Sequence, residues 1–250
     1  MTRSADLSRR IAAAGDAGKK EWWERYLKGE IEFFGVPMGD IRRVTKRWGD
    51  EHDLAPEELR SAAFELLRRP IAEEKLAGIL IMQELLLPAD ELDAGRDFPV
   101  IAALFDDGHI WEWNTTDWLC VRVLGPMIRR DGRPTARMLA RWTAAPGLWR
   151  RRAAAVSFVP VASQGDELFR GLVDVVIDVC AANVVDPERF AQTGVGWVLR
   201  DLSDAAPQRV FDFILANRNV MSREAVRMAS ARLPDDQRTR LGITGPRRRR

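Results

Sequence analysis

The sequence predicts an all-α protein built from stacked helix pairs, and three observations lead to this fold class. Apolar residues recur at the three- and four-residue spacing of helices through most of the chain. No stretch of convincing length alternates apolar and polar residues as a half-buried strand would. Helix pairs recur about every 35–45 residues, the spacing of HEAT-type repeats. Such pairs stack into a curved solenoid with a concave face, although an ordinary globular helical domain would also show this periodicity.

The first clearly delimited helices are expected at residues 55–67, 71–87 and 98–105. The first has Pro56 in its opening turn, where proline is tolerated because that amide has no helical partner. Pro88 stops the second helix, and Gly108 follows the end of the third.

Seven further helices are expected along the rest of the chain, separated by Pro-Gly, Asp-Gly or Asp-Pro breaks. They span residues 114–124, 134–143, 148–159, 167–182, 187–202, 207–216 and 222–233. The valine-rich stretch 172–179 is the one rival for a strand, and the length of apolar sequence around it favours a helix.

A chain of 250 residues can form one large domain or two small ones. We expect a single domain over residues 1–246, followed by a basic, disordered tail, Arg247–Arg250. The N-terminus lacks the apolar run of a signal peptide, and no stretch approaches the ~20 apolar residues of a membrane helix. We therefore expect a cytoplasmic monomer that binds no membrane.

The sequence contains few residues that could bind a metal ion or form a disulfide. Cys120 and Cys180 are too few for a disulfide scaffold or a four-cysteine site, and we expect both to be small buried residues. His52 and His109 lie far apart, so no cluster has the spacing of zinc ligands. We predict neither a metal nor another cofactor.

The charges are segregated along the chain although the net charge is only +2. Residues 51–117 contain sixteen acids and five basic residues, whereas residues 122–152 contain nine arginines and one acid, Asp131. Segregation of this kind is typical of a protein with one basic face, which suits phosphates. A solvated helix face is the ordinary alternative for a run of charges.

The most informative motif is the stretch 111–118, which holds three of the nine tryptophans. Trp113 and Asp117 are four residues apart and therefore share a face of the expected helix. A carboxylate beside an indole suits a cationic, sugar-like species. Taken separately, Asp117 could be an ordinary surface acid, Trp113 a core residue, and Arg150–Arg152 a solvated face.

Several short motifs, in order and at matching separations, show a family resemblance from about Trp23 to Leu233. They are Glu24-Arg-Tyr-Leu-Lys-Gly with Phe34-Gly-Val-Pro-Met-Gly-Asp, Trp113-x-x-x-Asp117, Trp149-Arg-Arg-Arg-Ala-Ala-Ala, Gly194-Val-Gly-Trp-Val-Leu-Arg-Asp201 and Ser222-Arg-Glu-Ala-Val. The chain resembles the bacterial AlkD-type DNA alkylation repair glycosylases, which are built of HEAT-like repeats. The resemblance implies a solenoid with a concave, basic DNA-binding face.

The resemblance also implies roles for individual residues. Asp117 corresponds to the catalytic carboxylate, and Trp113 and Trp197 to the indoles that hold the sugar of the lesion nucleotide. Further positions correspond to DNA-binding residues: Arg152, Arg151, Arg43, Tyr26 and Arg200. Taken alone, Tyr26 is an ordinary packing residue. The chain departs from the family pattern at Glu112, Asn114, Thr116 and Trp118, which puts the lesion preference in doubt.

The expected function is that of a monofunctional DNA glycosylase, an enzyme that hydrolyses the N-glycosidic bond of cationic N3- or N7-alkylated purines. Its partner would be double-stranded DNA, its product an abasic site, and bulky adducts could be substrates in self-resistance to an alkylating natural product. One alternative is a non-catalytic helical-repeat protein that binds damaged or distorted DNA, which would have no need of Asp117. Another is a protein-binding scaffold, which would need neither the Trp–Asp pair nor the segregated arginines.

Overall fold

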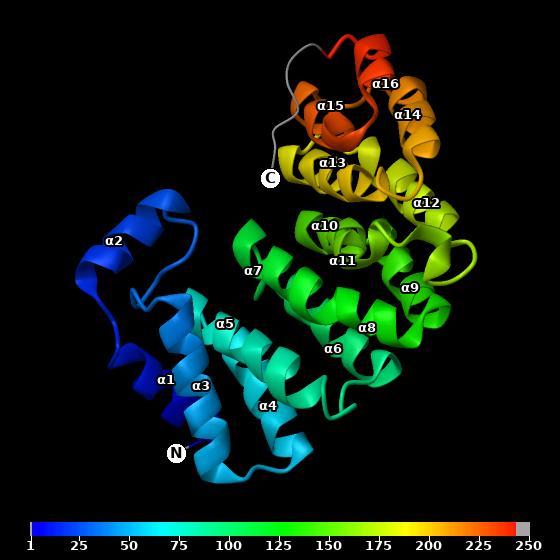
Figure 1. Ribbon diagram of the computed structural model, residues 1–250. Helices are drawn as coiled ribbons and strands as arrows, with labels where there is room; N and C mark the ends of the chain where they lie inside the picture. The colour runs from blue at the N-terminus through cyan, green and yellow to red at the C-terminus, as the bar shows by residue number, and fades with distance from the viewer. Residues whose placement is uncertain (1, 244–250) are drawn as a thin grey trace. The chain divides into compact units, whose positions relative to one another are not determined.

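The computed structural model describes residues 2–243, and every regular element in this range is a helix (Figure 1). The one β-type contact among these residues is an isolated bridge between Glu32 and Ile71. The predicted all-α class is therefore confirmed. None of the described helices is both long and apolar enough to cross a membrane. The predicted basic tail, Arg247–Arg250, lies outside the described residues.

The chain divides into two compact units, Met1–Val123 and Leu124–Arg250. The helices of the first unit are α1 (Arg3–Ala12), α2 (Ala17–Tyr26), α3 (Met38–His52), α4 (Pro56–Leu67), α5 (Ala72–Ile81), the π-helical η1 (Met82–Leu86), α6 (Ala94–Asp106) and α7 (Trp113–Leu119). A second π-helical segment, η2 (Cys120–Leu124), continues directly from α7. The single domain expected over residues 1–246 stays a prediction.

The second unit is also entirely helical within its described residues. Its elements are α8 (Gly125–Asp131), α9 (Arg133–Ala140), η3 (Arg141–Ala144), α10 (Leu148–Val156), α11 (Val159–Ala162), η4 (Gly165–Glu167), α12 (Leu172–Val184), α13 (Arg189–Leu202), α14 (Pro207–Ala216), α15 (Arg223–Ala229), η5 (Ser230–Arg232) and α16 (Asp235–Arg240). Helix α13 packs against α10, α12 and α15, so it forms the centre of this unit (Figure 1).

Local sequence explains where several helices begin. Asp16, Asp93 and Ser222 accept hydrogen bonds from backbone amides in the first turns of α2, α6 and α15, at 2.8, 2.7 and 3.1 Å. Short polar side chains at this position satisfy amides that have no partner inside the helix. The helix predicted for residues 207–216 has the observed bounds of α14, which starts at Pro207.

Some predicted boundaries are wrong. The helix predicted for 167–182 begins five residues later, at Leu172, because Gly171 adopts a left-handed φ of 89° that interrupts the helix. The helix predicted for 98–105 begins earlier, at Ala94, since Asp93 caps it. The helix predicted for 148–159 breaks at Ser157 and Phe158 into α10 and α11.

The core of the first unit depends on close contact between α4 and α5. Gly78 of α5 faces α4, and a Cβ atom at this position would lie 2.7 Å from the carbonyl oxygen of Ala63. The first unit also buries three large apolar side chains completely: Trp48, Ile79 and Phe98. Absence of a side chain at residue 78 therefore sets how closely the two helices approach.

The two cysteines occupy core positions, as the sequence predicts. Neither Cys120 nor Cys180 forms a disulfide, and neither has exposed surface. They pack as small apolar side chains in the first and second units respectively.

Substituting Gly78→Ala should lower the free energy of unfolding by about 1–3 kcal/mol, because the added methyl group meets a backbone carbonyl that is held in place. The matched control is Gly39→Ala in α3, where the added Cβ has open space and alanine favours the helix by up to ~1 kcal/mol. Urea unfolding of both variants checks this. Equal stability of the two variants would contradict the close contact.

Candidate functional site

Helix α7 carries the two residues that the sequence singles out for chemistry. Trp113 is its first residue and Asp117 follows one turn later, and both side chains are half-buried. Residues at this separation lie on the same face of a helix. The predicted indole–carboxylate pair is therefore present on one helix face that solvent reaches.

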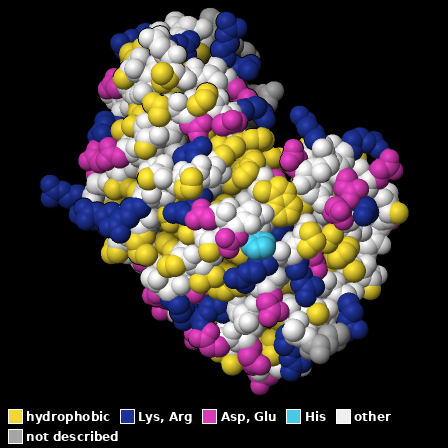
Figure 2. Space-filling model, turned by 180° about the vertical axis from the view of Figure 1, so that it is seen from behind, with side chains coloured by type: hydrophobic (Ala, Val, Ile, Leu, Met, Phe, Trp, Pro, Cys, Tyr) yellow, Lys and Arg dark blue, Asp and Glu magenta, His cyan; other side chains and the backbone are white. Residues whose placement is uncertain are grey.

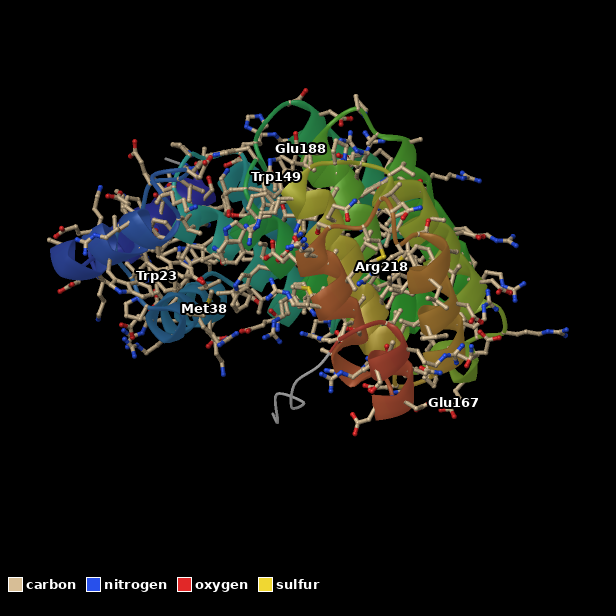
Figure 3. The ribbon with its side chains drawn as sticks, turned by 90° about the horizontal axis from the view of Figure 1, so that it is seen from above. Trp23, Met38, Trp149, Glu167, Glu188 and Arg218 are labelled. Atoms are coloured by element: carbon tan, nitrogen blue, oxygen red, sulfur yellow. The ribbon has the colours of Figure 1, made fainter. Side chains whose placement is uncertain are left out.

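Aromatic side chains from α2 extend the surface beside Trp113. The Tyr26 ring meets the Trp113 ring edge-on, with centroids 6.0 Å apart. Tyr26 also stacks on Trp22 at 5.4 Å, and more than half of the surface of each of these two side chains is exposed. Trp23, labelled in Figure 3, packs inward against Phe33 at 5.9 Å. The structure thus gives Tyr26 an exposed position next to the motif.

The two further tryptophans of the motif also have defined surroundings. The Trp111 indole nitrogen donates to the carbonyl oxygen of Glu30 at 2.7 Å, which ties the loop before α7 to the loop after α2. The guanidinium of Arg122 lies over the Trp118 ring, 5.1 Å from its centroid. Cation–π contact of this kind gives Trp118 a partner on the same helical run.

A buried lysine lies beneath the segment that leads into α7. Lys75 of α5 has no exposed surface, and its Nζ donates to the carbonyl oxygens of Leu67 and His109, each at 2.8 Å. Its ammonium group lies 4.7 Å from the centroid of the Trp111 ring. Burial lowers the pKa of Lys75 from 10.5 to about 8, while the charges of Glu112 and Glu74 act in the opposite direction.

Glu112 caps the start of α7 and is itself buried. Its carboxylate accepts hydrogen bonds from the amides of Asn114 and Thr115, at 2.5 and 2.6 Å. Burial raises the pKa of the Glu112 carboxyl above its ordinary value; the bonds from Thr115 and Asn114 lower it, and the charge of Asp117 raises it further. A second carboxyl group is therefore close enough to Asp117 to interact with it electrostatically.

In the second unit, Trp197 and Arg200 lie together on α13. The Arg200 guanidinium is 5.9 Å from the centroid of the Trp197 ring, and it pairs with Asp201 at 3.1 Å. Trp197 is half-buried. Because this residue belongs to the second unit, its predicted position facing Asp117 stays a prediction.

The arginines of α10 are bonded to neighbouring elements of the second unit. Arg152 is buried, and its Nη1 donates to the carbonyl oxygen of Phe190 at 2.6 Å and to the Thr193 hydroxyl at 3.2 Å. Arg151 pairs with Asp186 at 2.6 Å. Figure 3 labels Trp149 and Glu188 at the adjacent N-terminal ends of α10 and α13. These bonds place both arginines at contacts between helices, so binding phosphate would require either one to exchange partners.

On one face of the molecule, charge is more mixed than the segregated sequence indicates (Figure 2). On the face drawn in Figure 2, Lys and Arg side chains are interspersed with Asp and Glu side chains. Arg43, a predicted DNA-binding residue, is exposed and pairs with Asp40 at 2.6 Å. Arg130 pairs with its neighbour Asp131 at 2.6 Å. The expected basic concave face stays a prediction.

Sequence reasoning missed two features of the first unit. It did not single out Trp22, although two adjacent tryptophans four and three residues before Tyr26 are unusual in a polar helix. It also passed over Lys75, which could have been noticed as the one basic residue in the largely apolar stretch 71–87. Within the described residues, no group of three or more His, Cys, Asp or Glu side chains is arranged to hold a metal ion.

Comparison with known proteins identifies relatives of this chain. The model of a family described as DNA alkylation repair enzyme matches residues 7–233. A solved structure described as a predicted DNA alkylation repair enzyme from Enterococcus faecalis superimposes with a TM-score of 0.74 at 18% sequence identity. The match covers 88% of this chain and 97% of that one, which shows a common fold. No curated protein matches the chain.

The pKa of Lys75 predicts that stability rises with pH between about 8 and 10.5. In this window the unfolded chain binds the Lys75 proton and the folded protein does not, so raising the pH favours folding. A shift of this size corresponds to roughly 3 kcal/mol. Urea unfolding at several pH values, compared between the wild type and Lys75→Met, isolates the effect. Parallel pH profiles for the two proteins would show that Lys75 titrates normally.

Proposed function

Because the chain belongs to the DNA alkylation repair enzyme family, we propose that it is a monofunctional DNA glycosylase. It hydrolyses the N-glycosidic bond of cationic N3- or N7-alkylated purines in duplex DNA and leaves an abasic site. The observation that carries this proposal is the solvent-reachable Trp113–Asp117 pair on α7, with the exposed Tyr26 ring against the indole.

Alkylation at N3 or N7 gives the purine a positive charge and makes it a good leaving group. When the bond from C1′ to the base breaks, the base leaves with the electron pair and becomes neutral. The sugar then acquires the character of an oxocarbenium ion. The oxygen of a water molecule bonds to C1′ and releases a proton, which completes the hydrolysis without a lysine nucleophile or strand cleavage.

Asp117 and Trp113 suit the charge that develops in this step. A carboxylate held close to C1′ stabilises the positive sugar and orients the attacking water. The face of an indole attracts a cation through its ring quadrupole. We assign Trp197 the same function on the second unit; the Arg200 guanidinium, 5.9 Å from its ring centroid, supports an affinity of this ring for cations.

Affinity for duplex DNA would come from contacts with phosphates rather than from reading bases. Tyr26 and Arg43 are the exposed candidates in the first unit. Arg200, Arg151 and Arg152 are candidates in the second unit, and each would exchange a bond within the protein for one to phosphate. The exchange costs least for the partly exposed Arg200 and more for the buried Arg152, because the Phe190 carbonyl would lose its donor.

We expect the base to stay stacked while the sugar and backbone are held. Most glycosylases turn the base out of the duplex into a pocket that reads its edges. A site that grips the sugar sets no limit on the size of the group attached to the base. Bulky adducts could then be substrates, which would suit self-resistance to an alkylating natural product.

Asp117→Asn should reduce excision of 7-methylguanine from duplex DNA by about 10²–10³-fold, since it removes one electrostatic stabiliser of the transition state. Affinity for the DNA should change little because binding rests on phosphates. Single-turnover assays, with heat or alkali to cleave abasic sites, measure the rate. A wild-type enzyme that binds DNA and releases no base would instead identify a non-catalytic DNA-binding protein.

A panel of lesions tests the mechanism independently of any variant. The wild type should excise cationic purines that carry either a methyl or a bulky substituent. It should leave hypoxanthine in place, because a neutral base needs a proton before it can depart and the site contains no group assigned to supply one. Mass spectrometry of released bases measures all three. Rapid release of hypoxanthine would be incompatible with the proposed mechanism.

A further inference from the structure

Helix α7 begins a helical run that continues directly into η2, so no helical turn precedes it to hold its first residues. Two buried charged side chains hold its beginning instead. Glu112 does so from the cap position, and Lys75 does so from the neighbouring helix α5, which packs against α7. Neither residue belongs to the chemistry proposed for Asp117.

Glu112 fixes the first turn of α7 through both its side chain and its backbone. The carboxylate accepts from the amides of Asn114 and Thr115, and the backbone carbonyl accepts from the Thr116 hydroxyl at 2.7 Å. Three successive residues of the turn are thus bonded to one residue. Only 2% of Glu112 is exposed, so water does not compete for these bonds.

Lys75 fixes the segment that enters this turn. Its ammonium group binds the His109 carbonyl oxygen and lies under the Trp111 ring, and its charge attracts the carboxylate of Glu112. A further contact, to the Leu67 carbonyl oxygen, anchors the same group to the end of α4. Residues 109–112 are therefore attached to the core of the first unit through one ammonium group.

We propose that Lys75 and Glu112 are positioning residues for Asp117: together they fix the direction of α7 and so the place of its carboxylate. The proposal rests on the function proposed for Asp117. Asp117 lies five residues beyond Glu112, about 7.5 Å along the helix axis at 1.5 Å per residue. A small tilt at the cap therefore displaces the carboxylate, and a shift of about 1 Å can cost about 10²-fold in rate.

Charge, and not merely size, is needed at both positions. Glu112→Gln replaces one acceptor oxygen by an amide that cannot accept from a backbone N–H, and it removes the negative charge that attracts the Lys75 ammonium group. Lys75→Met removes the contacts to His109 and Trp111, and it leaves the buried Glu112 charge without the ammonium group that attracts it while the charge of Asp117 remains.

The test compares three variants in single-turnover excision of 7-methylguanine and in affinity for undamaged duplex. Glu112→Gln should excise about 10- to 10²-fold more slowly, with affinity within about twofold of the wild type. Lys75→Met should behave similarly, and the double variant should lose less than the product of the two losses. The matched control is Asp93→Asn, the same carboxylate-to-amide change at the cap of α6 in the same unit, which should keep the wild-type rate.

A structural role alone predicts a different pattern. If Asp93→Asn slows excision as much as Glu112→Gln at equal thermal stability, or if Glu112→Gln keeps the wild-type rate, the positioning role is overturned. Glu112→Gln, the milder change, decides the outcome if Lys75→Met fails to fold.

Amide hydrogen exchange separates failure of this proposal from failure of the proposed function. Positioning predicts faster exchange at residues 113–117 in Glu112→Gln but not in Asp93→Asn. If Asp117→Asn excises at the wild-type rate, the catalytic assignment has failed, and exchange still decides whether the pair positions α7. Unchanged exchange at residues 113–117 would overturn the positioning role.

Discussion

The ammonium group of Lys75 is buried in the core of the first unit, where water does not reach it. A buried charge is stable only when hydrogen-bond acceptors or opposite charges surround it. Its partners are two carbonyl oxygens at the ends of neighbouring segments, an indole face, and the carboxylates of Glu112 and Glu74. Satisfying this one group brings together the end of α4, the loop before α7 and the cap of α7. The placement of Asp117 depends on that arrangement, because the turn that leads to Asp117 is bonded to Glu112.

Two indoles near Lys75, those of Trp111 and Trp113, have different partners. Trp111 points its ring at the buried ammonium and its N–H at the Glu30 carbonyl, so it connects structural elements. Trp113 keeps part of its ring accessible and meets the exposed Tyr26. Two partly buried tryptophans of one motif thus differ in their partners: Trp111 contacts an ammonium group and a carbonyl oxygen, whereas Trp113 contacts an exposed aromatic ring.

The arginines illustrate why charge counted along a sequence differs from charge available at a surface. Nine arginines fall between residues 122 and 152, yet Arg152 is buried against Phe190, and Arg151 and Arg130 pair with carboxylates. Pairs of this kind lie partly exposed and are individually weak. Phosphate could compete for such side chains more readily than for Lys75, whose partners are shielded from solvent.

Periodicity, proline and cap residues determined most of the helices, since these signals act within a few residues. The helix from Pro207 to Ala216 has the predicted bounds, and the cap of α15 follows from Ser222 alone. The spacing of Trp113 and Asp117 likewise determined that they share a helix face. Tertiary structure decided what local signals do not encode. It broke the helix predicted from residue 167 at Gly171, and it buried the charged side chains of Lys75 and Glu112. Those outcomes depend on which segments distant in sequence become neighbours, because burial changes the cost of a charge and a local pattern does not record burial.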